Sequence, residues 1–304
     1  MTLQQLRYVV ALAETQHFAR AAERCHVSQS TLSIQLKKLE VYLGVTLFDR
    51  SLRRVMPTPL GREIVARAQN LLRETEQMRA LARSQRSDPM DHTVRLGVIP
   101  TVAPYLLPRV LPVVHHRHPR LRLLLREANT ENLLTELHMG RIDAALLSPP
   151  VPEAGLHLRL LYHEPFLAAL HADSPLAKQK RVSLQALAKE RLLLLEEGHC
   201  LRNQTLDVCG QSQPHNEEIK ATSLEMLRQM VACGIGCTLL PVLAAHSPSA
   251  GDKADAHVTL RPFQPPAPGR FIALVWRNRQ PLQETLQRLA GTLADHLPKD
   301  VTPI

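Results

Sequence analysis

Three stretches at the start of the chain carry apolar residues at helical spacing. The first covers residues 2–15, where Thr2 can cap the helix, and the second starts at Phe18 and is broken by "HVSQS". Ser28 or Ser30 then provides the cap for a third helix, whose buried side carries leucines at 32, 36 and 39. The pattern predicts two short helices, a tight turn and a third helix.

The exposed side of the third helix is rich in small polar side chains. Residues of this kind can reach base edges and phosphates when the helix enters the major groove of DNA. A helix-turn-helix from Phe18 to Lys37 is therefore predicted. The expected DNA-contacting residues are Ser28, Gln29, Ser30, Thr31, Ser33, Gln35 and Lys37.

The segment "LGVTLFDRSLRRVMPTPLG" shows two short strand-like pieces around a basic turn. It predicts a wing whose Arg50, Arg53 and Arg54 lie on backbone phosphates. The alternative for residues 1–60 is a plain three-helix bundle with a solvated polar face. That alternative is disfavoured because the face lacks the Glu/Lys ladders of ordinary surface helices.

Residues 59–87 keep a helical apolar stripe through Leu60, Leu71 and Met78, with charged residues elsewhere. A helix this long, with no domain of its own to bury against, suggests pairing with a second chain, although packing on its own domain is the alternative. The segment "SDPMDH" at 87–92 reads as a hinge.

From residue 93 the pattern changes to alternating strands and helices. Strands are predicted in "TVRLGVIP", "LRLLLREAN", "IDAALLS", "FLAALH" and "FIALVWR", with helices between them and a final helix at 281–297. This alternation predicts an α/β domain around a mostly parallel sheet. Such folds bind ligands at the carboxyl ends of strands, where Thr101 and Thr130 are expected to lie.

Composition narrows the class of protein. The net charge is +9, and residues 1–88 hold 14 Lys and Arg against 8 Asp and Glu, so a polyanion partner is expected at the N-terminal end. No run reaches the roughly 18–20 apolar residues of a membrane span, and the first residues lack the features of a secretory signal. Five irregularly spaced cysteines argue against a secreted disulfide framework. A cytoplasmic protein without membrane association is expected.

Residues 1–60 resemble the N-terminal domain of LysR-type transcriptional regulators. The matching blocks are "LQQLRYVVALAE", "HFARAAERCHVSQSTLSIQLKKLE", "LGVTLFDR" and "PTPLG". The resemblance implies a winged helix-turn-helix at 1–60, a linker and dimerisation helix with a hinge at 61–90, and an effector domain at 93–304. That domain would resemble the two-lobed periplasmic-binding-protein type, with lobe I at 93–164 and 268–304 and lobe II at 165–267.

The segment "EEGHCLRNQTLDVCG" places Cys200 beside His199 and two residues before Arg202, with Cys209 nine positions on. A reactive cysteine needs nearby positive charge, which these neighbours can supply, but two ordinary core cysteines remain the alternative. If the segment is helical, about 13 Å separates the two Cα atoms. A disulfide needs about 4.4–6.8 Å, so bridging them would force the segment to refold.

The resemblance narrows to the peroxide-sensing regulators of that family at residues 98–108, "LEEGHCLRNQ", Cys209 and "ATSLEMLRQMVACGIGCTLLP". It implies that Cys200 is the peroxidatic cysteine and Cys209 the resolving one, joined in a redox-active disulfide. It further implies a peroxide pocket formed by Thr101, Thr130, His199 and Arg202. Cys25, Cys233 and Cys237 are expected to be core or turn residues.

The same resemblance implies the partners of the chain. They are hydrogen peroxide, promoter DNA, RNA polymerase, a thiol reductant system of glutaredoxin or thioredoxin type, and further copies of the chain in a tetramer built as a dimer of dimers. No cofactor and no metal site are expected, and the chemistry is stoichiometric rather than enzymatic.

Three other functions stay open at this point. The chain could be a LysR-type regulator that binds a small organic effector in the cleft between the lobes. It could instead be a thiol peroxidase tethered to DNA, or a structural DNA-binding protein without sensing.

Overall fold

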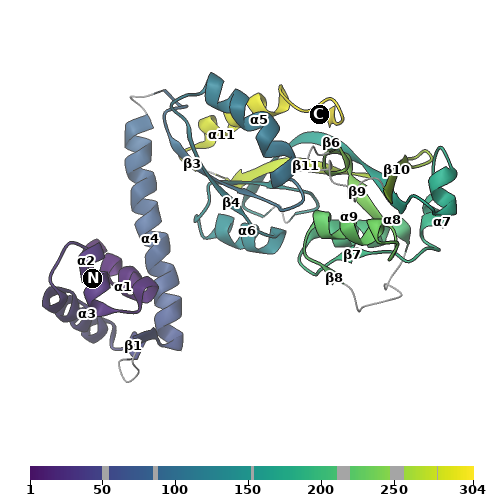
Figure 1. Cartoon of the computed structure of the whole chain (residues 1–304). Helices are drawn as coiled ribbons and strands as arrows, with labels where there is room; N and C mark the ends of the chain where they lie inside the picture. Colours follow the sequence, from purple (N-terminus) through teal and green to yellow (C-terminus); the bar gives the residue numbers. More distant parts are fainter. Residues whose placement is uncertain (50–54, 85–87, 152–153, 211–219, 247–256, 279) are drawn as a thin grey trace. The chain divides into compact units, whose positions relative to one another are not determined.

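The structure is a computed structural model that describes residues 1–49, 55–84, 88–151, 154–210, 220–246, 257–278 and 280–304. The chain divides into two compact units, Met1–Ser87 and Asp88–Ile304 (Figure 1). No helix among the described residues is both long and apolar enough to cross a membrane.

The first unit has the predicted order of elements. Its helices and strands are α1 (Leu3–Thr15), α2 (Phe18–Arg24), α3 (Gln29–Leu43), β1 (Phe48–Asp49), β2 (Met56–Pro57) and α4 (Pro59–Ser84). Thr2 caps α1 by accepting from the Gln5 amide at 3.2 Å, and the Gln5 side chain accepts from the Thr2 amide at 2.9 Å. Ser28 caps α3 by accepting from the Thr31 amide at 3.1 Å. The capping residues expected from the sequence therefore fix both helix starts.

The strands β1 and β2 form an antiparallel pair on either side of the basic turn. Arg50, Arg53 and Arg54, the predicted wing arginines, lie outside the described residues. On α4 two members of the predicted apolar stripe, Leu71 and Met78, are 46% and 69% exposed in the single chain.

The second unit alternates strands and helices. Its elements up to residue 171 are β3 (Thr93–Val98), α5 (Ala103–Arg117), β4 (Arg122–Glu127), α6 (Thr130–His138), β5 (Ala144–Leu147) and β6 (Leu156–His171). There follow the 3-10 turn η1 (Pro175–Lys178), α7 (Leu184–Leu187), β7 (Leu194–Leu195), α8 (Cys200–Cys209), β8 (Lys220–Ala221), α9 (Leu224–Ala232), β9 (Thr238–Pro241) and α10 (Val242–Ala245). The last described elements are β10 (Val258–Pro262), β11 (Gly269–Arg277), α11 (Gln283–Ala294) and β12 (Thr302–Pro303).

The main sheet has the strand order β10-β6-β11-β5-β3-β4, with β9 and β12 also pairing with β6. Among the strand pairs of this sheet that the structure describes, β3–β4 and β3–β5 are parallel, whereas β11 is antiparallel to both β5 and β6. The expectation of a mostly parallel sheet is therefore wrong for this half of the unit, because β11 returns from the far end of the chain between two earlier strands.

The strand β6 is longer than the sequence indicated. The prediction covered only "FLAALH" at 166–171, but the strand begins at Leu156. Its first half carries polar side chains at His157 and Arg159 that interrupt the apolar pattern. This first half pairs with β11, and the second half pairs with β9 and β10.

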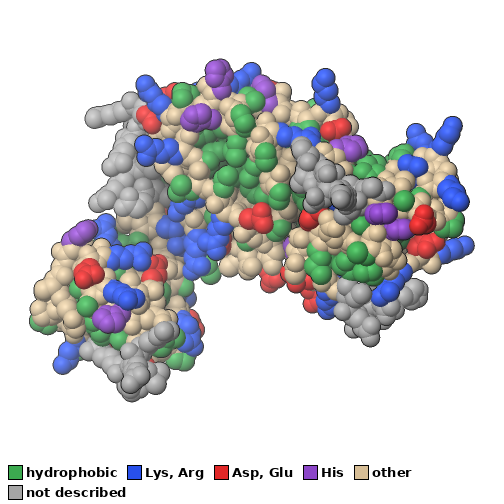
Figure 2. All heavy atoms as spheres, viewed as in Figure 1, with side chains coloured by type: hydrophobic (Ala, Val, Ile, Leu, Met, Phe, Trp, Pro, Cys, Tyr) green, Lys and Arg blue, Asp and Glu red, His purple; other side chains and the backbone are tan. Residues whose placement is uncertain are grey.

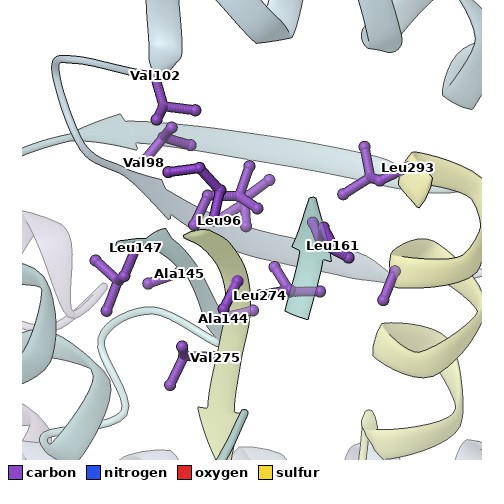
Figure 3. Packing of buried hydrophobic residues seen from close by; sticks show 14 of the residues in the cluster. Leu96, Val98, Val102, Ala144, Ala145, Leu147, Leu161, Leu274, Val275 and Leu293 are labelled. Carbon is purple, nitrogen blue, oxygen red and sulfur yellow. The ribbon is translucent and has the colours of Figure 1, made fainter. Parts of the chain in front are cut away.

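Two hydrophobic cores flank the two halves of β6. The first core lies among β3, β5, β11, α5 and α11, and Figure 3 shows Leu96, Ala145 and Leu274 packed together there. The second core gathers residues of β9, α8 and α9 around Phe166. Tyr105 and Leu167 contact both cores, so the two halves of the unit meet at these side chains.

Hydrophobic side chains also gather on the surface of this unit, over the region of β3, β4 and α5 (Figure 2). On the edge strand β4, Leu124 and Leu125 are 56% and 45% exposed. Exposed leucines on a sheet edge are typical of a surface that another chain covers.

Candidate functional site

The turn before α8 brings two helix starts together. Gly198 has a φ of +94°, in the left-handed region that favours glycine, and a Cβ there would lie 2.8 Å from Nδ2 of Asn129. Asn129 in turn caps α6 by accepting from the Asn132 amide at 3.0 Å. The first residues of the two helices, Thr130 of α6 and Cys200 of α8, therefore belong to neighbouring turns.

Helix α8 runs unbroken from Cys200 to Cys209. The Cα atoms of its two end residues are thus separated by a rise of about 13 Å, as the sequence predicted for a helical segment. Both thiols are free. Cys200 is half-buried and packs against the first core, whereas Cys209 is buried in the second core. One helix therefore holds its two cysteines in two different cores.

A buried ion pair lies across β6 and β11. Arg270 donates from Nε to Oε2 of Glu164 at 2.9 Å, and both side chains are 1% exposed. The other carboxylate oxygen, Oε1, accepts from the Leu243 amide at 3.1 Å. Gly269 makes this approach possible, since a Cβ there would lie 2.7 Å from the Glu164 carbonyl oxygen. The carboxylate is therefore bonded at both oxygens and holds the guanidinium in place.

The remaining donors of Arg270 bind Thr101. Nη1 donates to the Thr101 hydroxyl at 2.8 Å, and Nη2 donates to its carbonyl oxygen at 2.9 Å. Burial alone lowers the pKa of Arg270, but Glu164 and then the charge on Cys200 raise it, and the net shift is upward. The Cys200 sulfur thus lies within electrostatic reach of a fixed, permanently charged guanidinium.

Arg270 and Glu164 were not among the site residues predicted from the sequence. The available signal was a charged residue inside each of two otherwise apolar strands, "YHEPFLAAL" and "GRFIALVWR". Charged side chains are almost never fully buried unless they are paired, so extending the predicted strands "FLAALH" and "FIALVWR" toward the N-terminus would have included Glu164 and Arg270 and offered them as a pair.

Arg202, the cation expected from the sequence, takes a different position. Its Nη1 donates to the carbonyl oxygen of Leu195 at 3.1 Å, and the side chain is half-buried. That bond closes the loop before α8 onto β7, so Arg202 shapes this loop, and Arg270 is the cation whose pKa the charge on Cys200 raises.

His199 lies just before α8, with its side chain 9% exposed and Nε2 3.9 Å from Oε1 of Glu196. Burial lowers the pKa of His199 below its ordinary value of 6.5, and Glu196 and Glu127 only partly oppose the shift. The imidazole is therefore biased toward its neutral form, which can accept or donate a hydrogen bond.

Thr130, also expected in the site, has a hydroxyl oxygen that is buried without a hydrogen-bond partner. An unpaired buried hydroxyl is costly, and this one lies at the start of α6, directly after the N-cap Asn129 that faces Gly198. It is therefore a candidate position for a small polar ligand.

A cavity of about 800 Å³ opens beside this arrangement and is lined by Thr101 and His199. It also exposes the carboxylates of Glu127, Glu196 and Glu225. The structure thus brings Thr101 and His199 to one cavity, with residues on both sides of it coming from the two halves of the unit.

The other cysteines differ in environment. Burial raises the pKa of the Cys209 thiol, and burial followed by Glu190 and Cys209 raises the pKa of Cys237 to about 12. Cys233 is exposed at the end of α9, and Cys25 is half-buried after α2, where burial raises the pKa of its thiol. Among the residues that the structure describes, no group of three or more His, Cys, Asp and Glu side chains could hold a metal ion.

The predicted DNA-contacting face of α3 is open at its start. Ser28, Gln29, Ser30, Thr31 and Lys37 are exposed, and the Ser28 hydroxyl lies 2.9 Å from that of Ser30 and 2.8 Å from that of Thr31. Ser33 and Gln35 are half-buried. The Gln35 Oε1 accepts from Nε2 of Gln5 at 3.1 Å, so this side chain also ties α3 to α1.

Comparison with known proteins supports both units. Residues 3–62 match the family described as bacterial regulatory helix-turn-helix protein, lysR family, and residues 87–298 match the LysR substrate binding domain. The chain is 43% identical to the "Hydrogen peroxide-inducible genes activator" of Pectobacterium carotovorum subsp. carotovorum over 98% of this chain and 97% of that protein.

Solved structures agree with this. A full-length OxyR variant from Pseudomonas aeruginosa matches with a TM-score of 0.78 at 38% identity, covering 98% of each chain. An OxyR mutant from Corynebacterium glutamicum with H2O2 bound matches with a TM-score of 0.63 at 32% identity, covering 97% of this chain and 92% of that one.

Proposed function

Because the chain belongs to the LysR family of transcriptional regulators, and within it to the hydrogen peroxide-inducible activators called OxyR, we propose that it senses peroxide through Cys200 and Cys209. Its response to peroxide follows from that membership. The chemistry at individual residues is the proposal, and so is the arrangement of the effector unit as two lobes of the periplasmic-binding-protein type.

The first step is oxidation of Cys200. Its thiolate attacks one oxygen of hydrogen peroxide, the O–O bond breaks, and the products are a cysteine sulfenic acid and, after protonation, water. Arg270 and the N-terminus of α8 supply positive charge close to the sulfur, and the charge that develops on the leaving oxygen needs such a donor.

The hydroxyls of Thr101 and Thr130, the imidazole of His199 and Arg202 orient the peroxide in this proposal. Thr101 is held by Arg270, so its hydroxyl is fixed in direction. Thr130 offers an unpaired hydroxyl, and His199 a neutral ring on the cavity wall. Arg202 acts through the loop that it closes onto Leu195.

The second step closes a disulfide. The Cys209 sulfur attacks the sulfenic sulfur, the S–O bond breaks, and a second water leaves. The separation of about 13 Å along α8 excludes a bridge within the intact helix, so the segment from Cys200 to Cys209 must unwind first. Oxidation of the two cysteines therefore changes the shape of the segment. A thiol reductant of glutaredoxin or thioredoxin type then reduces the disulfide and restores the helix.

The signal passes to DNA through an assembly of chains. The exposed leucines of β4 and the exposed Leu71 and Met78 of α4 are surfaces suited to pairing, in accord with a dimer of dimers. Refolding of α8 alters the pairing of effector units, which rearranges the DNA-binding units on the promoter and changes their contacts with RNA polymerase. Each chain reacts once per signal in the cytoplasm, so it is a regulator and not an enzyme.

The observation that carries the proposal is the placement of Cys200 and Cys209 at the two ends of one helix and in two different cores. The test treats reduced full-length protein with one equivalent of peroxide and maps disulfides by peptide mass spectrometry, with promoter footprinting in parallel. A Cys200–Cys209 bridge with a changed footprint is expected. Peroxide-treated protein that lacks this bridge would overturn the proposal.

The cavity favours a second candidate, a small organic effector. Its volume of about 800 Å³ far exceeds that of a peroxide molecule, which is close to a water in size. In that case Cys200→Ser would leave the response to an inducer intact, whereas the peroxide proposal requires that this variant lose its response.

A further inference from the structure

Helix α8 is attached to both halves of the effector unit by different faces. Leu201, Thr205 and Cys209 recur every four residues and are buried toward the second core. Cys200 and Gln204 form a neighbouring stripe with the same spacing, and Cys200 packs on the first core. Unwinding the helix must therefore release two sets of contacts.

The attachment to the first half includes a hydrogen-bonded chain. Gln204 donates from Nε2 to the Ser148 hydroxyl at 2.9 Å, and Ser148 donates to the carbonyl oxygen of Phe271 at 2.8 Å. Ser148 follows β5 and is 2% exposed. Phe271 directly follows Arg270 on β11. These hydrogen bonds therefore connect α8, which carries Cys200, to β11, which carries Arg270.

This connection is held by one bond only at the glutamine. The other polar atom of the amide, Oε1 of Gln204, is buried without a hydrogen-bond partner. A buried unpaired oxygen favours any state in which water can reach it. The docked helix thus has a hydrogen bond that resists release and an unsatisfied oxygen that favours release, both on the same side chain.

We propose that Ser148 and Gln204 are positioning residues that hold α8 in its helical, reduced form and so set the rate of disulfide closure. The proposal rests on the peroxide chemistry of Cys200 and Cys209 described above. The two residues do not touch the reacting atoms; they act on the step between sulfenic acid and disulfide, in which α8 must leave the first core.

The direction of the effect follows from which state contains the bond. The Ser148–Gln204 bond is present when α8 is helical and is lost when the segment unwinds. Removing the Ser148 hydroxyl also leaves the Gln204 amide nitrogen buried and unpaired in the helical form. Ser148→Ala therefore destabilises the reduced form relative to the disulfide form. Closure should become roughly five- to tenfold faster, and the disulfide harder to reduce.

The experiment separates the two chemical steps. Sulfenic acid formation is measured by trapping with a dione reagent in a Cys209→Ser background, where closure cannot occur. Disulfide closure is measured by rapid mixing with peroxide, acid quench and thiol alkylation in chains that retain both cysteines. Ser148→Ala is expected to leave the trapping rate within twofold of the parent while it accelerates closure.

Two further variants make the result specific. Gln204→Met removes the bonded amide nitrogen and the unpaired Oε1 together at similar length, so adding Ser148→Ala to this background should no longer accelerate closure. Ser174→Ala is the matched control, because it removes a serine hydroxyl that accepts from the Leu176 amide at 3.2 Å, away from α8. This control should close at the parent rate.

The outcomes distinguish this inference from the proposal beneath it. If no Cys200–Cys209 bridge forms in the parent protein, the peroxide mechanism itself fails. If the bridge forms but Ser148→Ala closes within twofold of the parent and the control, or accelerates closure equally in the Gln204→Met background, the positioning role fails alone. Equal acceleration by Ser174→Ala would also overturn it, because any loss of a hydrogen bond would then suffice.

Discussion

Arg270 donates from Nη1 to the hydroxyl of Thr101 at 2.8 Å, so the buried cation of β11 is joined to a residue two positions before the start of α5. Since Nη2 binds the Thr101 carbonyl and Nε binds Glu164, every edge of the guanidinium is engaged. A donor fixed in this way costs no reorganisation when negative charge develops beside it.

Replacing Arg270 by lysine should slow sulfenic acid formation at Cys200 by roughly 100-fold. Lysine keeps a charge but cannot bond Thr101 and Glu164 in the same fork geometry, so the cation loses its fixed position. The rate is measured against peroxide concentration by trapping in a Cys209→Ser background. Arg261→Lys is the control, because Arg261 binds the Ala177 carbonyl in another part of the unit. Equal rates in the two variants would contradict the role of Arg270.

Thr130→Val should change the rate of sulfenic acid formation at Cys200 without lowering the free energy of unfolding. Its hydroxyl has no hydrogen-bond partner among the described residues, so valine removes a buried unpaired group and should leave the free energy of unfolding unchanged or raise it by about 1 kcal/mol. If that hydroxyl binds peroxide, the same change slows sulfenic acid formation severalfold. Urea unfolding and trapping kinetics give the two readouts. A variant that is as reactive as the parent would remove Thr130 from the peroxide site.

The lowered pKa of His199 predicts that the free energy of unfolding depends on pH. Burial holds its folded-state pKa below 6.5, so the unfolded chain binds a proton more readily than the folded protein does. The contribution of the neutral ring is fully present above pH 6.5 and is lost as the pH falls through the lowered folded value.

Urea unfolding of the reduced protein at several pH values between 7.5 and 5 tests this. The free energy of unfolding should fall more steeply toward pH 5 in the parent than in His199→Gln, which carries no titrating ring. Parallel pH curves for the two proteins would show that the imidazole is not held neutral by burial.

Variants of the DNA-binding unit should distinguish residues that contact bases from residues that contact phosphates. Gln29 is exposed at the start of α3, so Gln29→Ala should weaken binding to a cognate site by about 1–3 kcal/mol and leave nonspecific binding unchanged.

Arg53 is expected on a phosphate, so Arg53→Ala should weaken both kinds of binding and lower the slope of log K against log salt by about one. Titrations of cognate and unrelated duplexes at several salt concentrations separate these effects, and a specific loss from Arg53→Ala would contradict the wing assignment.

Local patterns predicted most of the elements correctly. Thr2, Ser28 and the apolar stripes determine helix starts through contacts a few residues apart, and these contacts are visible in the sequence. The position of β11 between β5 and β6 was not visible, because it depends on pairing between residues more than one hundred positions apart. The same applies to the first half of β6, whose polar residues hide the strand.

In the site, too, local features could be anticipated from the sequence, whereas features that depend on distant parts of the chain could not. The separation of Cys200 and Cys209 was derived from the segment on the condition that it is helical, and the structure meets that condition. Arg270 was missed because its reach to Cys200 exists only after β11 has returned across the sheet. Arg202, three positions from His199, was the cation that sequence proximity offered, yet its guanidinium turns back to Leu195. Nearness along a helix does not determine which way a long side chain points.

The single strand β6 serves both hydrophobic cores, and its sixteen residues are paired along most of their length. Bending the effector unit at the middle of β6 would break hydrogen bonds of this continuous ladder. In the proposed chemistry the signal is a covalent change at the two cysteines, so it counts the peroxide molecules that have reacted and not the fraction of time that a ligand is bound. The signal then persists after the oxidant has gone, until electrons are returned to the sulfur atoms.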